Sequence, residues 1–128
     1  MVDAGFRILV VEDEELLRRL LVTALSSRGH RVEAVRDGEE AAAKLQTERY
    51  DLVITDFRMP RMTGLALIQW LQAREDRVPV VLMSSNTLEE MGASLQDLAG
   101  VEFLRKPFGL VDLFTCVQRA RRPPKPPE

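Results

Sequence analysis

The sequence predicts an α/β fold: a doubly wound sheet of five parallel strands with five helices on its two faces. Two observations predict this class. Short apolar runs bounded by turn residues, typical of strands buried in a parallel sheet, alternate with longer segments whose apolar residues recur at helical spacing. Parallel strands need crossover connections, so this alternation favours a sheet covered by helices on both faces. The 128 residues suffice for one domain with a buried core.

Each predicted strand is a short run of β-branched and other apolar residues that ends at a turn signal. The third is the clearest, because its apolar run stops abruptly at Asp56 and a turn punctuated by Pro60 and Gly64 follows. In open parallel sheets the ligand crevice lies beyond the carboxyl ends of the strands, which places Asp56 there. The five predicted strands are Arg7–Val11, Arg31–Val35, Leu52–Asp56, Val80–Met83 and Val101–Leu104.

The predicted helices follow the strands in turn. In the first, six apolar residues at helical spacing mark one apolar face, and Gly29 ends the helix because glycine tolerates the left-handed cap conformation. These six residues are Leu16, Leu17, Leu20, Leu21, Ala24 and Leu25. The other four are Glu39–Thr47, a helix capped by Thr63 that runs through Leu71, a weaker helix over about 88–98, and Leu110–Arg121.

The charge balance and the cysteine count exclude several classes of function. A formal net charge of −2 argues against a nucleic-acid footprint spread over the domain. The single cysteine, Cys116, excludes an internal disulfide and a zinc cluster built from cysteines. The first residues lack the apolar core of a signal peptide, and no apolar run approaches membrane-spanning length. We therefore expect a cytoplasmic protein without a membrane or nucleic-acid partner.

Polar residues stand at the carboxyl ends of four predicted strands. If the first strand is central, these ends are neighbours, and clustered carboxylates raise one another's pKa unless a cation neutralises them. Ligation by a few carboxylate oxygens suits Mg²⁺, and a hydroxyl and an ammonium beside the metal would let the site hold three phosphoryl oxygens. The residues are Glu12 and Asp13 after the first strand, Asp56 at the third, Ser84 at the fourth and Lys106 after the fifth.

Four segments of the chain together resemble the receiver domain of response regulators in two-component signalling. They are 8–14, 56–64, 80–85 and 103–108, and all four occur in order at receiver-like spacings. The resemblance spans about 7–121 and implies the flavodoxin-like receiver fold, with strand order 2-1-3-4-5. It implies a receiver domain over 1–122, followed by a Pro-rich tail or linker over 123–128.

The resemblance assigns the phosphoacceptor and the metal ligands. Asp56 matches the residue that takes a phosphoryl group from a phosphohistidine of a partner kinase. Asp13 matches a direct ligand of Mg²⁺, and Glu12 matches an acidic position that acts through a metal-bound water. The main-chain carbonyl of Arg58 matches a further metal ligand, and Asp56 itself completes the set. The long Arg58 side chain, two residues past the acceptor, is placed to cover the phosphoryl group and hinder an attacking water.

The resemblance also assigns the switching residues. Lys106 matches the cation that pairs with the phosphoryl group, and Ser84 matches the switch hydroxyl, where threonine is commoner. Phe103 matches the aromatic switch position, without the hydroxyl of a tyrosine. Pro107 matches the proline that follows the family's lysine through a cis peptide bond. The implied event is that phosphorylation draws Ser84 inward, Phe103 moves into the vacated space, and the surface of the fourth helix, fifth strand and fifth helix changes.

The implied function is a phosphoacceptor switch that catalyses its own phosphorylation and loses the group slowly, not a turnover enzyme. The implied partners are a sensor histidine kinase or phosphotransfer protein as donor and an effector domain or protein as output. A homodimer formed on phosphorylation is compatible with the resemblance. Whether the domain acts alone or continues through the Pro-rich tail into an effector is left open by the sequence.

Other interpretations stand beside this one. A small phosphatase with an aspartyl-phosphate intermediate generally needs a second acid/base carboxylate shortly after the nucleophile, and 57–62 contain none. A pseudo-receiver would act only as an interaction module. At single positions, Glu12 and Asp13 could be favourable charges at a helix N-terminus, and Phe103 could be a core residue only.

Overall fold

The computed structural model describes residues 5–59, 61–87, 90 and 100–121. Its strands form one sheet in the order β2-β1-β3-β4-β5, and every neighbouring pair is parallel. The predicted fold class and strand order are therefore confirmed. The strands are β1 (Arg7–Val11), β2 (Arg31–Val35), β3 (Leu52–Asp56), β4 (Val80–Ser84) and β5 (Val101–Arg105).

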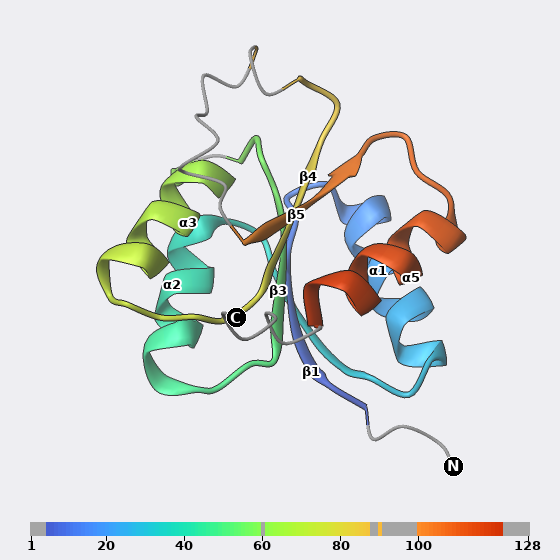
Figure 1. Cartoon of the computed structure of the whole chain (residues 1–128), viewed down its shortest axis with the longest axis horizontal. Coiled ribbons are helices and arrows are strands. Elements are labelled where there is room, and N and C mark those ends of the chain that lie inside the picture. Colours follow the sequence, from blue (N-terminus) through green and yellow to red (C-terminus); the bar gives the residue numbers. More distant parts are fainter. Residues whose placement is uncertain (1–4, 60, 88–89, 91–99, 122–128) are drawn as a thin grey trace, which may run out of the picture.

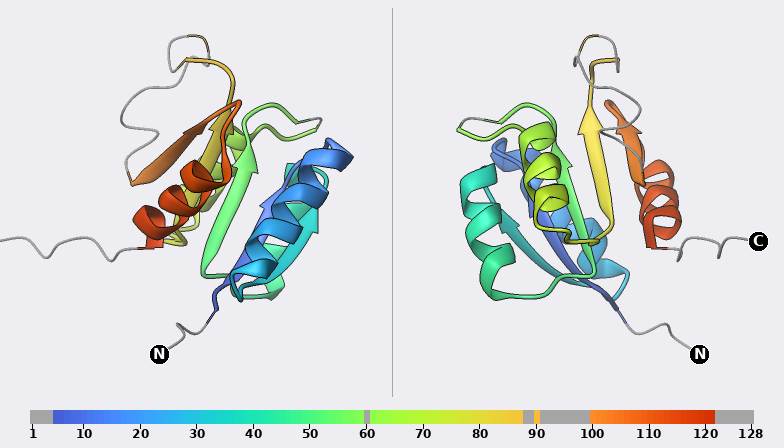
Figure 2. Two further views of the ribbon diagram at one scale, coloured as in Figure 1. Left: turned by 90° about the vertical axis from the view of Figure 1, so that its right-hand side faces the viewer. Right: turned by 60° about the vertical axis from the view of Figure 1, so that its left-hand side comes forward.

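Helices cover both faces of the sheet. Figure 1 shows the sheet edge-on, with α2 and α3 on one face and α1 and α5 on the other, and Figure 2 shows this arrangement from two further sides. The predicted helix over 88–98 and the Pro-rich segment over 123–128 lie outside the described residues. The described helices are α1 (Glu15–Ser27), α2 (Gly38–Thr47), α3 (Gly64–Ala73) and α5 (Leu110–Arg121).

The core consists of two hydrophobic clusters, one on each face of the sheet. Successive strand residues point to opposite faces, so Ile8 and Val10 of β1 pack with α1 and α5, whereas Leu9 and Val11 pack with α2 and α3. All four of these side chains are fully buried. Burial on both faces explains why the central strands have continuous apolar runs and no alternation with polar residues.

The apolar face predicted for α1 is wider than the face that the sheet covers. Leu21 and Leu25 are fully buried, but Leu16 is 77% exposed and Leu20 is 51% exposed. Successive residues of an α-helix are turned by about 100°, so Leu16 and Leu20 lie beside the arc that faces the strands. The sheet therefore covers only part of the apolar face predicted for this helix.

None of the helices in the described ranges combines the length and the apolar character needed to cross a membrane.

Candidate functional site

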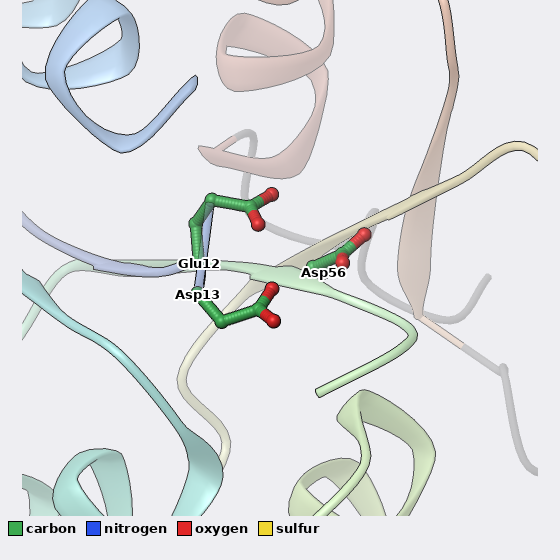
Figure 3. Close-up of side chains that lie close together, drawn as sticks. All are labelled: Glu12, Asp13 and Asp56. Atoms are coloured by element: carbon green, nitrogen blue, oxygen red, sulfur yellow. The ribbon is translucent and has the colours of Figure 1, made fainter. Parts of the chain in front are cut away.

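The fold brings the predicted acidic residues together at the carboxyl ends of the strands. Glu12 and Asp13 follow β1, and Asp56 is the last residue of the neighbouring β3. One carboxylate oxygen from each of the three lies within 4.8 Å of the others. Figure 3 shows the three carboxyl groups projecting toward the same space beyond the strand ends.

Lys106 is the cation of this cluster. Its Nζ lies 2.8 Å from Asp56 Oδ1 and 3.3 Å from Glu12 Oε1, so it bridges the two buried carboxylates. The Lys106 backbone N–H donates to the Ser84 carbonyl oxygen at 2.9 Å, which fixes the residue against the end of β4. The peptide bond that joins Lys106 to Pro107 is cis.

Burial and mutual contact shift the pKa values of Glu12, Asp56 and Lys106. Glu12 is only 1% exposed, and burial raises its pKa to about 7, although the Glu14 N–H at 3.0 Å opposes the shift. Burial likewise raises the pKa of Asp56, and the ammonium of Lys106 opposes that shift. For Lys106, burial lowers the pKa, but the hydrogen bond and charge of Asp56, with the charge of Glu12, raise it overall. Lys106 is therefore the charged partner of two carboxylates that are costly to ionise.

The donor set fits a magnesium ion. It consists of oxygens only, and bond lengths of about 2.0–2.1 Å place octahedral ligand oxygens about 3–4 Å apart. One oxygen each from Glu12, Asp13 and Asp56 lies within 4.8 Å of the other two. A cation would also relieve the repulsion among the three carboxylates.

The other predicted residues lie on β4, on β5 and just after β3. Ser84 is the buried last residue of β4, and its Oγ accepts the Asn86 N–H at 2.9 Å. Arg58 is exposed two residues past β3, and its Nε donates to Asn86 Oδ1 at 3.2 Å. Phe103 lies in β5, which pairs with β4, and its half-buried ring packs on the α2 and α3 side of the sheet. The metal-ligand role of the Arg58 carbonyl and the switch role of Phe103 stay predictions.

Two supporting contacts have no simple signal in the sequence. Arg18 Nη1 donates to the carbonyl oxygens of Glu12 at 3.1 Å and Asp13 at 3.4 Å, which holds the acidic turn after β1. A Cβ on Gly64 would lie 2.3 Å from the Asp56 carbonyl oxygen, so only glycine permits this approach of α3 to β3. The sequence pattern indicates only that Arg18 is a polar residue of a helix and that Gly64 belongs to a turn.

The sequence matches the model of the response regulator receiver domain family over residues 8–118. This chain belongs to that family. It is a receiver domain of two-component signalling.

Curated relatives of the receiver domain are transcriptional and response regulators. It is 36% identical over 121 residues to the response regulator MprA of Mycobacterium avium, covering 94% of this chain and 53% of MprA. It is 33% identical over 114 residues to the regulatory protein AtoC of Escherichia coli, covering 89% of this chain and 25% of AtoC. The chain therefore spans about half of the first relative and a quarter of the second.

Solved structures agree with the fold of this receiver domain. The chemotaxis response regulator CheY4 of Vibrio cholerae superposes with a TM-score of 0.77 at 28% identity, covering 92% of this chain and 99% of CheY4. The receiver domain of the sensor histidine kinase PA1611 of Pseudomonas aeruginosa superposes with a TM-score of 0.81 at 34% identity, covering 92% of this chain and 98% of that domain. The PA1611 structure has a magnesium ion coordinated in its active-site cleft.

Proposed function

We propose that this receiver domain accepts a phosphoryl group from a phosphohistidine onto Asp56, with Mg²⁺ bound, and that the modification changes a surface read by an effector. The observation that supports this most is the position of the Lys106 Nζ, 2.8 Å from Asp56 Oδ1 inside a cluster of three carboxylates. A nucleophilic carboxylate must be ionised, and Lys106 favours ionisation against the cost of burial. The cytoplasm is the proposed compartment, as is typical of response regulators.

The proposed transfer is an in-line displacement. An Asp56 carboxylate oxygen attacks phosphorus, the new O–P bond forms as the P–N bond to the donor histidine breaks, and the imidazole leaves with that electron pair. Lys106 neutralises the charge gathering on the phosphoryl oxygens. In this proposal the Ser84 hydroxyl, at the end of β4, donates to one of them. Asp13, Asp56 and the Arg58 carbonyl would hold Mg²⁺ directly and Glu12 would hold it through a water, and the bound ion would supply further positive charge to the same oxygens.

The proposed output is a change in the surface of β5 and α5 and the segment over 88–98, which lies outside the described residues. Before phosphorylation, the Ser84 Oγ accepts the Asn86 N–H, so a new phosphoryl oxygen would compete for this hydroxyl. Phe103 lies on the neighbouring edge strand β5, where its half-buried ring packs on the α2 and α3 side of the sheet. A repositioned Phe103 ring would therefore alter this surface for an effector.

We further infer that the phosphodonor protein docks on the apolar groove beside the site. The groove has a volume of about 550 Å³ and is continuous with the site, because Lys106 forms part of its wall. Leu16 and Leu20 line one side and are largely exposed, while Pro107 and Phe108 line the other. A helix that carries the phosphohistidine could bury its apolar face here and bring the phosphorus to Asp56.

Intact-mass spectrometry after incubation with acetyl phosphate tests the acceptor assignment. With Mg²⁺ we expect a gain of one phosphoryl mass, and we expect no gain when Mg²⁺ is chelated or when Asp56 is replaced in Asp56→Asn. Asp51→Asn is the matched control, because Asp51 is exposed before β3 and far along the strand from the site. A gain that persists in Asp56→Asn would refute the assignment, and sustained release of phosphate over many turnovers would favour the phosphatase.

A further inference from the structure

Arg18 reaches back from α1 to the turn that carries two of the acidic residues. Its Nη1 donates to the Glu12 carbonyl oxygen at 3.1 Å and to the Asp13 carbonyl oxygen at 3.4 Å. The Arg18 backbone N–H donates to the Glu14 carbonyl oxygen at 2.9 Å, in the first turn of the helix. The backbone and the side chain of Arg18 therefore both bond to the turn between β1 and α1. A change in the path of that turn would break at least one of these contacts.

The three carboxylates of the acidic cluster are not held equally. Glu12 and Asp56 are buried, and their carboxylates lie 3.3 Å and 2.8 Å from the Lys106 ammonium. Asp13 is exposed, so packing restrains its carboxylate least. Figure 3 shows that its side chain nevertheless projects toward the same space as the other two. The direction of the Asp13 side chain therefore depends mainly on the backbone from which it projects, which is the backbone that Arg18 holds.

We propose that Arg18 is a positioning residue for the metal ion: by holding the backbone of the acidic turn it keeps Asp13 directed at the site and so sets the affinity for Mg²⁺. This inference rests on the proposed function, in which Asp13 binds Mg²⁺ directly. Mg²⁺ requires near-ideal octahedral geometry, so a ligand that is out of place costs affinity. A turn without the Arg18 contacts would also have to be ordered when the ion binds, and the entropy lost in that ordering opposes binding.

The positive charge of Arg18 cannot produce this effect. A guanidinium stays protonated in proteins, and a cation close to the site repels a second cation. Charge alone therefore predicts that Mg²⁺ binds more tightly when a neutral residue replaces Arg18. Positioning predicts the opposite, so the sign of the change in affinity distinguishes the two roles. Positioning is the larger effect in this proposal, because Arg18 is only half-buried and water screens its charge.

Calorimetric titration with Mg²⁺ measures the affinity of the wild type, Arg18→Met, Arg18→Lys and Arg19→Met. Methionine has a helix propensity close to that of arginine, and circular dichroism with urea unfolding verifies that each variant is folded. Arg18→Lys keeps the charge, but its amine ends one bond short of the position of Nη1. Arg19→Met is the matched control, because Arg19 is the next residue of the same helix, is exposed and pairs with Glu15 at 3.1 Å. The rate of phosphorylation by acetyl phosphate is measured over a range of Mg²⁺ concentrations.

We expect Arg18→Met to bind Mg²⁺ about tenfold more weakly than the wild type, the cost typical of losing a group that orients a metal ligand. Arg18→Lys should fall between the two, and Arg19→Met should match the wild type. The Mg²⁺ concentration that gives half-maximal phosphorylation should rise in Arg18→Met by the same factor. The rate at saturating Mg²⁺ should stay as in the wild type, because Arg18 does not touch the reacting groups in this proposal.

An affinity of Arg18→Met for Mg²⁺ that equals or exceeds that of the wild type or of Arg18→Lys overturns the positioning role, even if the variant unfolds at lower urea. A loss of affinity of the same size in Arg19→Met overturns it as well. Either result leaves the proposed function standing. A wild type that binds no Mg²⁺ overturns both.

Discussion

At the scale of single residues, burial makes the ionised form of Glu12 unfavourable. This carboxyl is almost fully buried beside Asp56, and burial raises its pKa from an ordinary 4.5 to about 7. Between these values the folded protein keeps a proton that the unfolded chain has lost, so stability falls as the pH rises through this window. Below this pH window Glu12 is protonated in both states and does not change the free energy of unfolding with pH. Above the window Glu12 is ionised in both states, and the full destabilisation from its buried charge remains.

Glu12→Gln should therefore stabilise the protein more at pH 8 than at pH 4.5 when Mg²⁺ is chelated, by a few kcal/mol at most, since each pKa unit corresponds to about 1.4 kcal/mol. Glutamine keeps the shape of the protonated acid and carries no charge to bury. Urea unfolding of both proteins at the two pH values measures the difference. A stability gain for Glu12→Gln that is equal at both pH values, or larger at the lower one, would contradict the burial argument.

The closeness of Asp56 and Lys106 could be predicted from the sequence, because the ends of the apolar runs indicate where the strands end. Asp56 and Lys106 each follow an apolar run, and parallel pairing forces such ends together. The supporting contacts of Arg18 and Asn86 could not be predicted in the same way. They depend on the paths of the turns after β1 and β4, which no periodic pattern encodes.

At the scale of elements, the connection from β3 to α3 holds Asp56 in place. Thr63 Oγ1 accepts the Ala66 N–H at 3.1 Å and begins α3, while Gly64 lies directly against the Asp56 carbonyl. On the other side of the loop, Met62 packs so closely on Gly38 of α2 that a Cβ there would lie 2.6 Å from the Met62 Cβ. The loop after Asp56 is thus fixed by close packing at both of its sides.

Gly64→Ala should lower the free energy of unfolding by about 1–3 kcal/mol, because the added methyl group must displace backbone rather than a flexible side chain. It should also slow phosphorylation of Asp56 by acetyl phosphate. Gly109→Ala is the matched control, because a Cβ there would meet only Asp112 Oδ2 at an ordinary 3.7 Å. Urea unfolding and intact mass measure the two effects, and equal behaviour of the two variants would refute the close-approach argument.

Sequence patterns predicted where the strands and the described helices lie better than they predicted which residues of each element are buried. The apolar stripe of α1 located the helix, but hydrophobic spacing alone cannot tell which of its leucines the sheet covers. Leu16 and Leu20 are exposed because coverage depends on the width of the packed neighbour, a property of the tertiary structure.

At the scale of the whole molecule, the acidic cluster with Lys106 and the exposed apolar groove lie at the same edge of the sheet. The two hydrophobic clusters stabilise the fold on either face of the sheet, while the acidic cluster and Lys106 lie at the strand ends between them. The groove at Leu16 and Leu20 opens next to Lys106. An apolar surface in this place suits a protein donor and is not needed by a small phosphodonor.

Replacing both exposed leucines, in Leu16→Ser/Leu20→Ser, should slow phosphotransfer from a sensor kinase by tenfold or more while phosphorylation by acetyl phosphate stays as in wild type. The kinase is the most active of a panel of autophosphorylated sensor kinases tested on wild type. Val111→Ser is the control, since Val111 is also 77% exposed but does not line the groove. An equal loss with both donors would mean a damaged site rather than a lost docking surface.

Reductive trapping of the acyl phosphate tests the central claim most directly. The protein is incubated with acetyl phosphate, with Mg²⁺ or with a chelator, then reduced with borohydride, digested and sequenced by mass spectrometry. Reduction converts an aspartyl phosphate into homoserine. We expect homoserine at position 56 in the sample with Mg²⁺ and aspartate there in the chelated one. Homoserine at another aspartate, at no position, or equally without Mg²⁺ would contradict the assignment of Asp56 as a Mg²⁺-dependent phosphoacceptor.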